Sequence, residues 1–286
     1  MKFAWIKDHA DQFDIKVMLK TLRASKSGYY DWIDRPLSQC AKRRQVIVEQ
    51  IRKAYKDSHN IYGSPRIAVE LKASGMKVCQ NTVAKYMRQE GLKSKVKRPF
   101  RVRTTDSNHE HPVAMNLLDR TFSAQAPDRK WCVDITYVPT GEGWLYLAAV
   151  IDLFSRKIVG WEMADHLRAE LCVNALSMAI ERRRPDPGLL HHSDRGVQYA
   201  CETYRSFLDR YGIEPSMSRT GDCYDNAAME SFFSTLKREL IYHEKYQTRD
   251  EARLSIFEYI EVFYNRKRRH SAIGYQSPES FEASRN

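Results

Sequence analysis

A chain of 286 residues, 42% of them hydrophobic, is long enough for one large domain or two to three smaller ones with real cores. Lysine and arginine outnumber aspartate and glutamate by 47 to 36, and this net charge of +11 favours a polyanionic partner such as nucleic acid. No apolar run of about 18 residues could cross a bilayer and no secretion signal opens the chain, so we expect a cytoplasmic protein without a membrane partner. The six cysteines form no C-x-x-C pair, which argues against a zinc site and a disulfide framework.

Residues 1–57 are expected to form an N-terminal helical region. In residues 14–34, apolar side chains at helical spacing lead into an aromatic cluster, which fits either a DNA-reading helix-turn-helix or a small core. Residues 38–57 predict a longer helix with an apolar stripe inward and many basic residues outward. We interpret that helix as a scaffold or spacer.

Residues 58–103 predict a helix-turn-helix DNA-binding domain with a basic tail. One helix is expected over about residues 64–75, begun by Ser-Pro and ended by glycine, and a polar-faced second helix over about 80–90. A purely structural helical hairpin has the same pattern, but the basic run that follows favours DNA, because phosphate contacts beside a reading helix supply affinity. The candidate DNA contacts are Gln80, Asn81, Lys85, Arg88, Lys93, Lys95, Lys97, Arg98, Arg101 and Arg103.

Residues 104–127 are polar with little periodicity and are expected to be a linker. The pattern then changes to strands, which alternate or are continuously apolar and are separated by short turns. Helices and strands alternate after this antiparallel meander. The order over residues 128–286 is therefore βββαβαβα plus a terminal helix, an α/β domain with a mixed sheet.

Three acidic residues stand among core-forming neighbours in this domain. Asp134 lies within the first strand, Asp194 ends the fourth, and Glu230 lies on a helix predicted over residues 225–240. Carboxylates in such surroundings repel one another and lose hydration, so a cluster is costly unless protons or cations neutralise it. Hard divalent cations, Mg²⁺ or Mn²⁺, suit an all-oxygen site, and two of them can promote in-line phosphoryl transfer.

The helix that carries Glu230 has one buried apolar stripe and one polar ridge. At about 100° per residue, Asn226 and Lys237 share that ridge with Glu230. Asp222 or Asp225 could cap the start of the helix. Taken alone, the ridge could equally be an ordinary surface salt bridge between Lys237 and Glu230.

Six segments of the chain together carry a family resemblance. They are Ser27-Gly-Tyr-Tyr-Asp-Trp32, Tyr62-Gly-Ser-Pro-Arg66, Trp131-Cys-Val-Asp-Ile-Thr-Tyr137, His192-Ser-Asp-Arg-Gly196, Asp225-Asn-Ala-Ala-Met-Glu-Ser-Phe-Phe233 and Tyr264-Asn-Arg-Lys-Arg-Arg-His270. In this order they resemble the second-frame (OrfB) product of bacterial insertion-sequence transposases, which belong to the DDE superfamily of retroviral integrases and transposases. The 35 residues between Asp194 and Glu230 match the aspartate-aspartate-glutamate pattern of that superfamily.

The resemblance implies a ribonuclease H-like integrase catalytic domain over residues 128–286, preceded by an all-α helix-turn-helix region. It implies metal-dependent cleavage at the ends of the element and strand transfer of the released 3′ hydroxyl, with Asp134, Asp194 and Glu230 holding two Mg²⁺ or Mn²⁺ ions. Asn226 and Lys237 match positions near the DNA, and Arg195 is a plausible phosphate contact. Asp152 is a weaker acidic candidate, better explained as a turn-forming residue.

The implied partners are double-stranded DNA at the terminal inverted repeats and at the target, other copies of the chain on that DNA, and the first-frame (OrfA) protein. The chain lacks the sustained heptads expected of that first frame, so it could act as a fusion with it. Two rival functions stay open on the sequence alone. One is a non-catalytic DNA-binding regulator, and the other is a ribonuclease H-type nuclease that cuts without joining.

Overall fold

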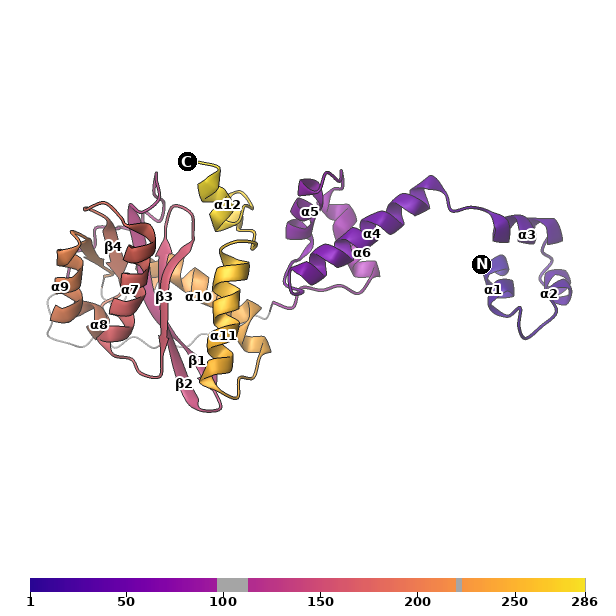
Figure 1. Ribbon diagram of the computed structural model, residues 1–286. Coiled ribbons are helices and arrows are strands. Elements are labelled where there is room, and N and C mark those ends of the chain that lie inside the picture. The colour runs from indigo at the N-terminus through magenta and orange to yellow at the C-terminus, as the bar shows by residue number, and fades with distance from the viewer. Residues whose placement is uncertain (97–112, 220–222, 286) are drawn as a thin grey trace.

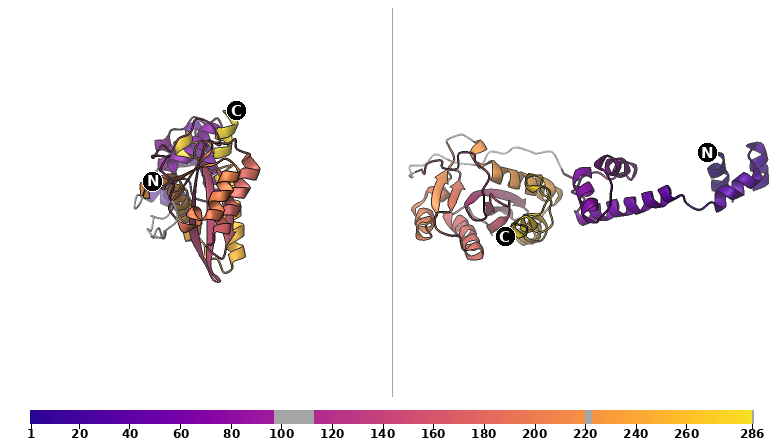
Figure 2. Two further views of the ribbon diagram at one scale, coloured as in Figure 1. Left: turned by 90° about the vertical axis from the view of Figure 1, so that its left-hand side faces the viewer. Right: turned by 90° about the horizontal axis from the view of Figure 1, so that it is seen from above.

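The computed structural model describes residues 1–96, 113–219 and 223–285. Three parts follow one another along the molecule: a small N-terminal bundle, a second helical domain and an α/β domain (Figure 1). The view from above shows the same row of three parts (Figure 2). No helix within the described ranges is long and apolar enough to cross a membrane.

The N-terminal bundle consists of α1 (Lys2–Asp8), α2 (Ile15–Thr21) and α3 (Lys26–Asp34). Asp14 and Ser25 cap α2 and α3 by accepting hydrogen bonds from backbone N–H groups in the first turn of each helix. The three helices enclose a small core of their own, formed by Ile6, Met18, Leu19 and Tyr29. The aromatic cluster predicted here is therefore partly core, through Tyr29.

The second helical domain consists of α4 (Gln39–Asp57), α5 (Ser64–Ala73) and α6 (Gln80–Gln89). Apolar residues at helical spacing bury one face of each helix against the other two, and Val83 and Met87 of α6 are among them. The opposite face of α6 is polar and exposed, as the sequence predicted. It presents Asn81, Lys85 and Arg88, and Gln80 is exposed at the first residue of the helix.

A five-stranded sheet forms the centre of the α/β domain, in the spatial order β3-β2-β1-β4-β5. The first three strands are antiparallel, β4 runs parallel to β1, and β5 runs parallel to β4. This topology confirms the ribonuclease H-like mixed sheet expected from the order of the elements. The strands are β1 (Lys130–Thr140), β2 (Gly143–Asp152), β3 (Ile158–Ala164), β4 (Leu190–Ser193) and β5 (Glu214–Met217).

Helices cover both faces of the sheet (Figure 1). On one face, Trp131 and Val133 of β1 pack with α7 (Ala169–Arg183), α8 (Val197–Ala200) and α9 (Glu202–Arg210). On the other, Cys132 and Val138 pack with α10 (Ala227–Glu239) and α11 (Arg249–Phe257). Alternation along β1 thus assigns its odd-numbered and even-numbered side chains to two separate cores.

The terminal helix differs from its prediction. α11 continues as a π-helix over Glu258–Tyr264, and α12 (Pro278–Ala283) follows after an irregular stretch. Short 3₁₀ turns occupy Cys223–Asn226, Ile241–His243 and Ser271–Ile273. π-helical turns often occur at functional sites, and this one leads directly into the Tyr264–His270 segment.

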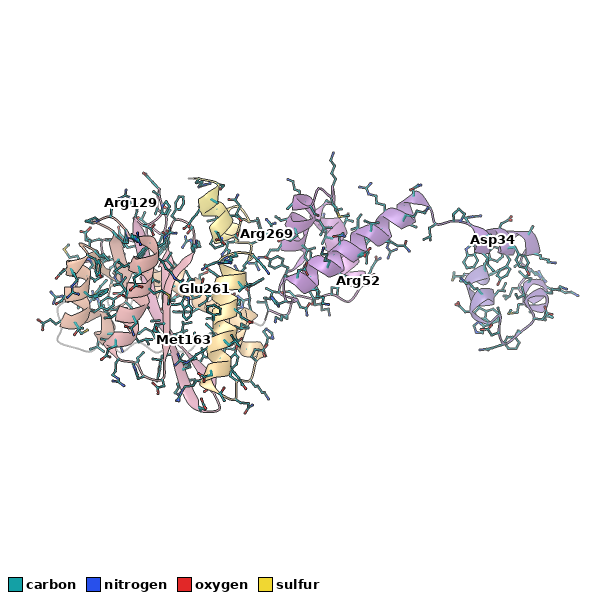
Figure 3. The ribbon with its side chains drawn as sticks, viewed as in Figure 1. Asp34, Arg52, Arg129, Met163, Glu261 and Arg269 are labelled. Carbon is teal, nitrogen blue, oxygen red and sulfur yellow. The ribbon has the colours of Figure 1, made fainter. Side chains whose placement is uncertain are left out.

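The helix-turn-helix domain is docked on the α/β domain. The Tyr62 hydroxyl accepts a hydrogen bond from the Arg269 N–H (2.8 Å), and the Arg269 guanidinium pairs with both carboxylate oxygens of Glu70 on α5 (2.6 and 2.9 Å). Arg269 lies at this junction in Figure 3. Tyr62 and Phe263 belong to one apolar cluster that spans both domains, so the two domains share a core.

Part of the predicted 104–127 linker packs against the α/β domain. The Leu117 and Leu118 N–H groups donate to the Ser216 hydroxyl, and the Leu118 side chain is buried. The Asn116 amide donates to Asp225 (2.8 Å). The ends of the linker and of the other predicted domains stay predictions, and residues 104–112 lie outside the described ranges.

We predict that Gly160→Ala destabilises the sheet. A Cβ at Gly160 in β3 would press on the Ala175 carbonyl and stand 2.7 Å from the Ala179 Cβ of α7. Forcing these elements apart should cost about 2 kcal/mol, measured as a lower urea midpoint by tryptophan fluorescence. In the control, Gly63→Ala, the nearest atom stands 3.8 Å from the new Cβ, and its midpoint should stay near that of the unsubstituted protein. Equal midpoints for the two variants would contradict this account of the contact.

Candidate active site

Asp134 and Asp194 are neighbours because β1 and β4 run parallel in register. Cys132 pairs with His192, and each aspartate lies two residues further along its strand direction. Two steps of alternation favour the face that α10 covers for both side chains, on neighbouring strands whose backbones lie about 4.8 Å apart. The sheet therefore brings together two carboxylates that are 60 residues apart in the sequence.

A backbone N–H orients each aspartate. The Ile135 N–H donates to Oδ1 of Asp134 (2.7 Å), and the Gly196 N–H donates to Oδ1 of Asp194 (2.9 Å). A Cβ at Gly196 would stand 3.0 Å from that same Asp194 oxygen, closer than side-chain contacts normally come. Glycine in the His-Ser-Asp-Arg-Gly segment thus leaves room for the Asp194 carboxylate.

Glu230 lies in the first turn of α10, and this helix packs against β1. Met229, Phe232 and Leu236 anchor the helix in the core, whereas Glu230 is exposed. Asp225, predicted as a possible cap, does not cap α10. It is buried and accepts hydrogen bonds from the Arg219 N–H (2.8 Å) and the guanidinium groups of Arg219 and Arg120. Asp222 lies outside the described residues.

The pKa values of Asp225 and Asp134 are shifted in opposite directions. The shifts distinguish a carboxylate that stabilises the fold, Asp225, from one that lies in the candidate site, Asp134. Burial raises the pKa of Asp225, but hydrogen bonds from Arg219 and Arg120 outweigh it and hold that pKa at about 2. The pKa of Asp134 is raised well above its ordinary value, first by burial and then by the negative charges of Asp194 and Glu230. Lys237 opposes that rise. Asp194, Glu230 and Lys237 therefore each lie within electrostatic reach of Asp134.

The oxygen donors of this site fit a hard divalent cation. Among the described residues, no group of three or more His, Cys, Asp or Glu side chains lies close enough together to hold a metal ion. Asn226 adds a further oxygen. Its Nδ2 donates to the Val133 carbonyl (3.1 Å), and its buried Oδ1 has no hydrogen-bond partner within the described part of the chain. That oxygen can therefore accept a hydrogen bond from a group that enters the site.

The other predicted DNA contacts near the acids have varied surroundings. Asn226 is buried, so its side chain faces β1 in this structure rather than the surface. Lys237 is half-buried, with Nζ 4.7 Å from the Tyr137 ring centroid, and burial lowers its pKa. Nε of Arg195 donates to the Ser218 carbonyl (2.7 Å). In the helical domain Lys93 is exposed and Lys95 half-buried, whereas Lys97, Arg98, Arg101 and Arg103 lie outside the described residues.

Asp152 has the structural role that its position suggested. Its carboxylate accepts hydrogen bonds from the Asp128 and Phe154 N–H groups (2.7 Å each) at the turn after β2. Arg183 of α7 lies 3.6 Å away and also binds Asp128 and Glu282. This network was missed by the sequence interpretation, because its members are spread from residue 128 to residue 282 with no common spacing.

Matches to known families cover both main domains. Residues 124–223 and 211–278 match two models described as "Integrase core domain", and residues 42–100 match "HTH-like domain". "Transposase InsF for insertion sequence IS3A" of Escherichia coli (strain K12) is 43% identical over 284 residues, 99% of this chain and 98% of that protein. "Insertion element IS600 uncharacterized 31 kDa protein" of Shigella sonnei is 44% identical over 264 residues, 92% and 97% of the two chains. The catalytic core of BIV integrase aligns with a TM-score of only 0.42 at 16% identity, over 55% of this chain and 95% of that one.

The integrase core places the α/β domain among the polynucleotidyl transferases, enzymes that break and join DNA strands. Integrase core domains use divalent metal ions. The chain belongs to the IS3 family of DDE insertion-sequence transposases. It is a DNA transposase, with a helix-turn-helix domain in front of the integrase core.

Two buried histidines of β4, His191 and His192, should make the stability of the core sensitive to acid. Burial, together with the nearby His192, lowers the pKa of His191 to about 3, and burial lowers that of His192 to about 4. Both histidines take up a proton below about pH 6.5 in the unfolded chain, whereas in the folded chain they stay neutral to a much lower pH. Stability is therefore fully present above that pH and is lost as the pH falls toward 4.

We predict that His191→Gln flattens this pH dependence, because the glutamine amide does not titrate. That amide can also form a hydrogen bond with the Tyr204 hydroxyl, which lies 2.8 Å from Nε2 of His191. Between pH 7 and 4.5, the unsubstituted core should lose roughly 2 kcal/mol per buried histidine, and the variant should lose about half the total. Urea unfolding at several pH values measures this. His9→Gln, in the N-terminal bundle, is the control. An unchanged pH dependence in His191→Gln would refute the assignment to His191.

Proposed function

We propose that Asp134, Asp194 and Glu230 are the catalytic residues and that they hold two divalent cations, Mg²⁺ or Mn²⁺. The observation that carries the proposal is the in-register pairing of β1 and β4, which sets the two aspartates side by side under the helix that bears Glu230. When bound, the two cations would activate the attacking hydroxyl and neutralise charge on the leaving oxygen.

The reaction proposed for this site has two displacements at phosphorus. Water first attacks the phosphodiester at the end of the element, which leaves a 3′ hydroxyl on the element. That hydroxyl then attacks a phosphodiester of the target, forms a new P–O bond and releases a 3′ hydroxyl of the target. No covalent bond to the protein is needed, so no serine, tyrosine or cysteine is required beside the acids.

The protein contributes positioning and charge. Asp134 and Asp194 are held in one orientation by the Ile135 and Gly196 N–H groups before any substrate binds, which limits the reorganisation required during the reaction. Lys237 lies within electrostatic reach of Asp134, where its ammonium could bind a phosphate oxygen of the strand. Asn226 contributes by holding β1 against the start of α10, through its hydrogen bond to the Val133 carbonyl.

We further propose that α6 reads the terminal repeats of the element, since its polar face is exposed along the whole helix. Arg195 and the basic residues after α6 would bind phosphates of the same DNA or of the target. As with other polynucleotidyl transferases that pair two DNA ends, we expect several copies of the chain to act together. We also propose that it works with the first-frame protein of the element, or as a fusion with it.

Asp134→Asn should abolish strand joining while DNA binding is retained. The substitution keeps the side-chain shape and removes one cation ligand, so joining of a labelled element-end duplex in Mg²⁺ should fall on the order of 100-fold or more. Because the Asp134 charge is disfavoured by burial, Asp194 and Glu230, the unfolding midpoint should not fall. Asp165→Asn removes an exposed acid just after β3 and should join normally.

The products of the same assay separate the possible activities. Joined products support the transposase mechanism, products that are cut but not joined indicate a nuclease, and duplex that is bound but unchanged indicates a regulator. Joining by Asp134→Asn at the rate of the unsubstituted protein would exclude the proposed catalytic role. Chelation of divalent cations should stop the unsubstituted protein in the same way as the substitution.

Lys85→Gln and Arg88→Gln should each weaken DNA binding and its dependence on salt. If each side chain binds one phosphate, the slope of log affinity against log salt should fall by about 0.9 per variant. Fluorescence anisotropy of the full chain on an element-end duplex, over a salt series, gives the slope. Lys245→Gln, an exposed lysine of the α/β domain, is the control. Slopes identical to the control in both α6 variants would remove α6 from the interface.

A further inference from the structure

A cavity of about 410 Å³ lies at the junction of the two main domains. It is bounded by α10, by the end of the π-helix and by the start of α5. The segments Tyr62–Arg66 and Tyr264–His270, which have no part in the proposed chemistry, meet here. The polar groups that line it include Arg66, Arg156, Arg268, His270, Ser231 and Thr235.

The charges around this cavity do not balance. Arg268 is buried and binds Glu239 through two hydrogen bonds (2.8 and 2.7 Å), and Nη1 of Arg66 lies 3.5 Å from the same carboxylate. Arg156 donates to the Phe122 carbonyl (2.8 Å) and pairs with no carboxylate of the described residues. Three arginines thus face one glutamate. Excess positive charge in a partly buried place is costly unless an anion binds.

His270 does not change this balance. Burial, and then the charges of Arg268, Arg66 and Arg156, lower its pKa to about 2, so it is neutral at physiological pH. That all three guanidinium groups act on one ring also indicates that they converge on the same space. A neutral imidazole and the hydroxyls of Ser231 and Thr235 are suitable hydrogen-bond donors to an anion.

The cavity opens beside the candidate active site. Ser231 and Ser271 at its mouth are exposed, so solutes can reach it. Ser231 and Thr235 line it from one ridge of α10, while Glu230 and Lys237 occupy the neighbouring ridge, about 100° around the helix. A strand that crosses α10 would therefore meet the catalytic acids on one side and the arginines on the other.

We propose that this cavity binds a phosphate group, supplied by the backbone of a DNA strand that passes over α10 between the helix-turn-helix domain and the acids. Guanidinium groups match phosphate oxygens in geometry and charge. Because Arg66 comes from α5 and the other two arginines from the α/β domain, the bound phosphate also ties the two domains together. This inference rests on the proposed function only in one respect, that DNA is the source of the phosphate.

The test uses the full chain without divalent cations, so it does not depend on the catalytic acids. Arg66→Gln and Arg156→Gln each remove one cavity charge and leave the Arg268–Glu239 pair intact. Ser231→Glu places a negative charge at the exposed mouth without disturbing the core. Arg253→Gln removes a half-buried arginine that binds the Met163 carbonyl outside the cavity, and it is the matched control.

Two measurements are made on each protein. Inorganic phosphate, titrated by calorimetry at constant ionic strength, should bind the unsubstituted protein and Arg253→Gln alike. Binding should be about 10-fold weaker in each cavity variant, as expected for the loss of a charge-assisted contact. For an element-end duplex, the slope of log affinity against log salt should fall by about 0.9 in the arginine variants, as expected for one lost phosphate contact.

The outcomes separate the anion site from its source. Equal phosphate binding in the unsubstituted protein, the cavity variants and the control would overturn the proposal. Weaker phosphate binding with an unchanged DNA slope would uphold the anion site but assign it to free phosphate or a nucleotide, and reject the DNA strand. Loss of both supports the full proposal. If the arginine variants unfold, Ser231→Glu decides the anion site alone, and failure of Asp134→Asn to block joining would leave this result unaffected.

Discussion

The parallel pairing of β1 with β4 is the constraint on which the rest of the α/β domain depends. It brings Asp134 close to Asp194, although the two residues are 60 positions apart in the sequence. The arrangement is unfavourable in itself, because burial and the neighbouring acids raise the pKa of Asp134. The surrounding structure must therefore hold the strands in register against that repulsion. Buried pairs on the two faces of β4, His191 with Tyr204 and His192 with Ser216, help to supply this support.

The carboxylates of this protein fall into two groups by their environment. Asp225 and Glu239 are buried next to arginines, their pKa values are lowered, and they stabilise the folded chain. Asp225 fixes the start of α10 and Glu239 fixes its end, so the helix that carries Glu230 is held at both termini. Asp134 lies among like charges and gains nothing comparable from folding. A carboxylate that the fold destabilises is better explained by binding of a cation than by stability.

Local patterns predicted much of this site and non-local contacts supplied the rest. Alternation in β1 identified the face of Asp134, and helical spacing put Asn226, Glu230 and Lys237 on one ridge. Neither pattern contains the register of β1 with β4, which depends on packing across the whole sheet. Asn226 shows the same limit, since its place on the polar ridge does not reveal that the amide is buried against Val133. The arginines that hold Asp225 and the docking of Tyr62 on Arg269 also join distant segments without a shared period.

Docking fixes the position of the helix-turn-helix domain relative to the α/β domain. The two domains share an apolar core, and the Arg269 pair with Glu70 adds a directional link between them. The distance from the polar face of α6 to Asp134, Asp194 and Glu230 is therefore set by packing rather than by a flexible connection. The N-terminal bundle differs, because residues 35–38 join it to α4 without regular structure and its core is separate (Figure 1). The α6 domain thus holds a fixed spacing between its exposed polar face and the three acids, whereas the N-terminal bundle shares no core with them.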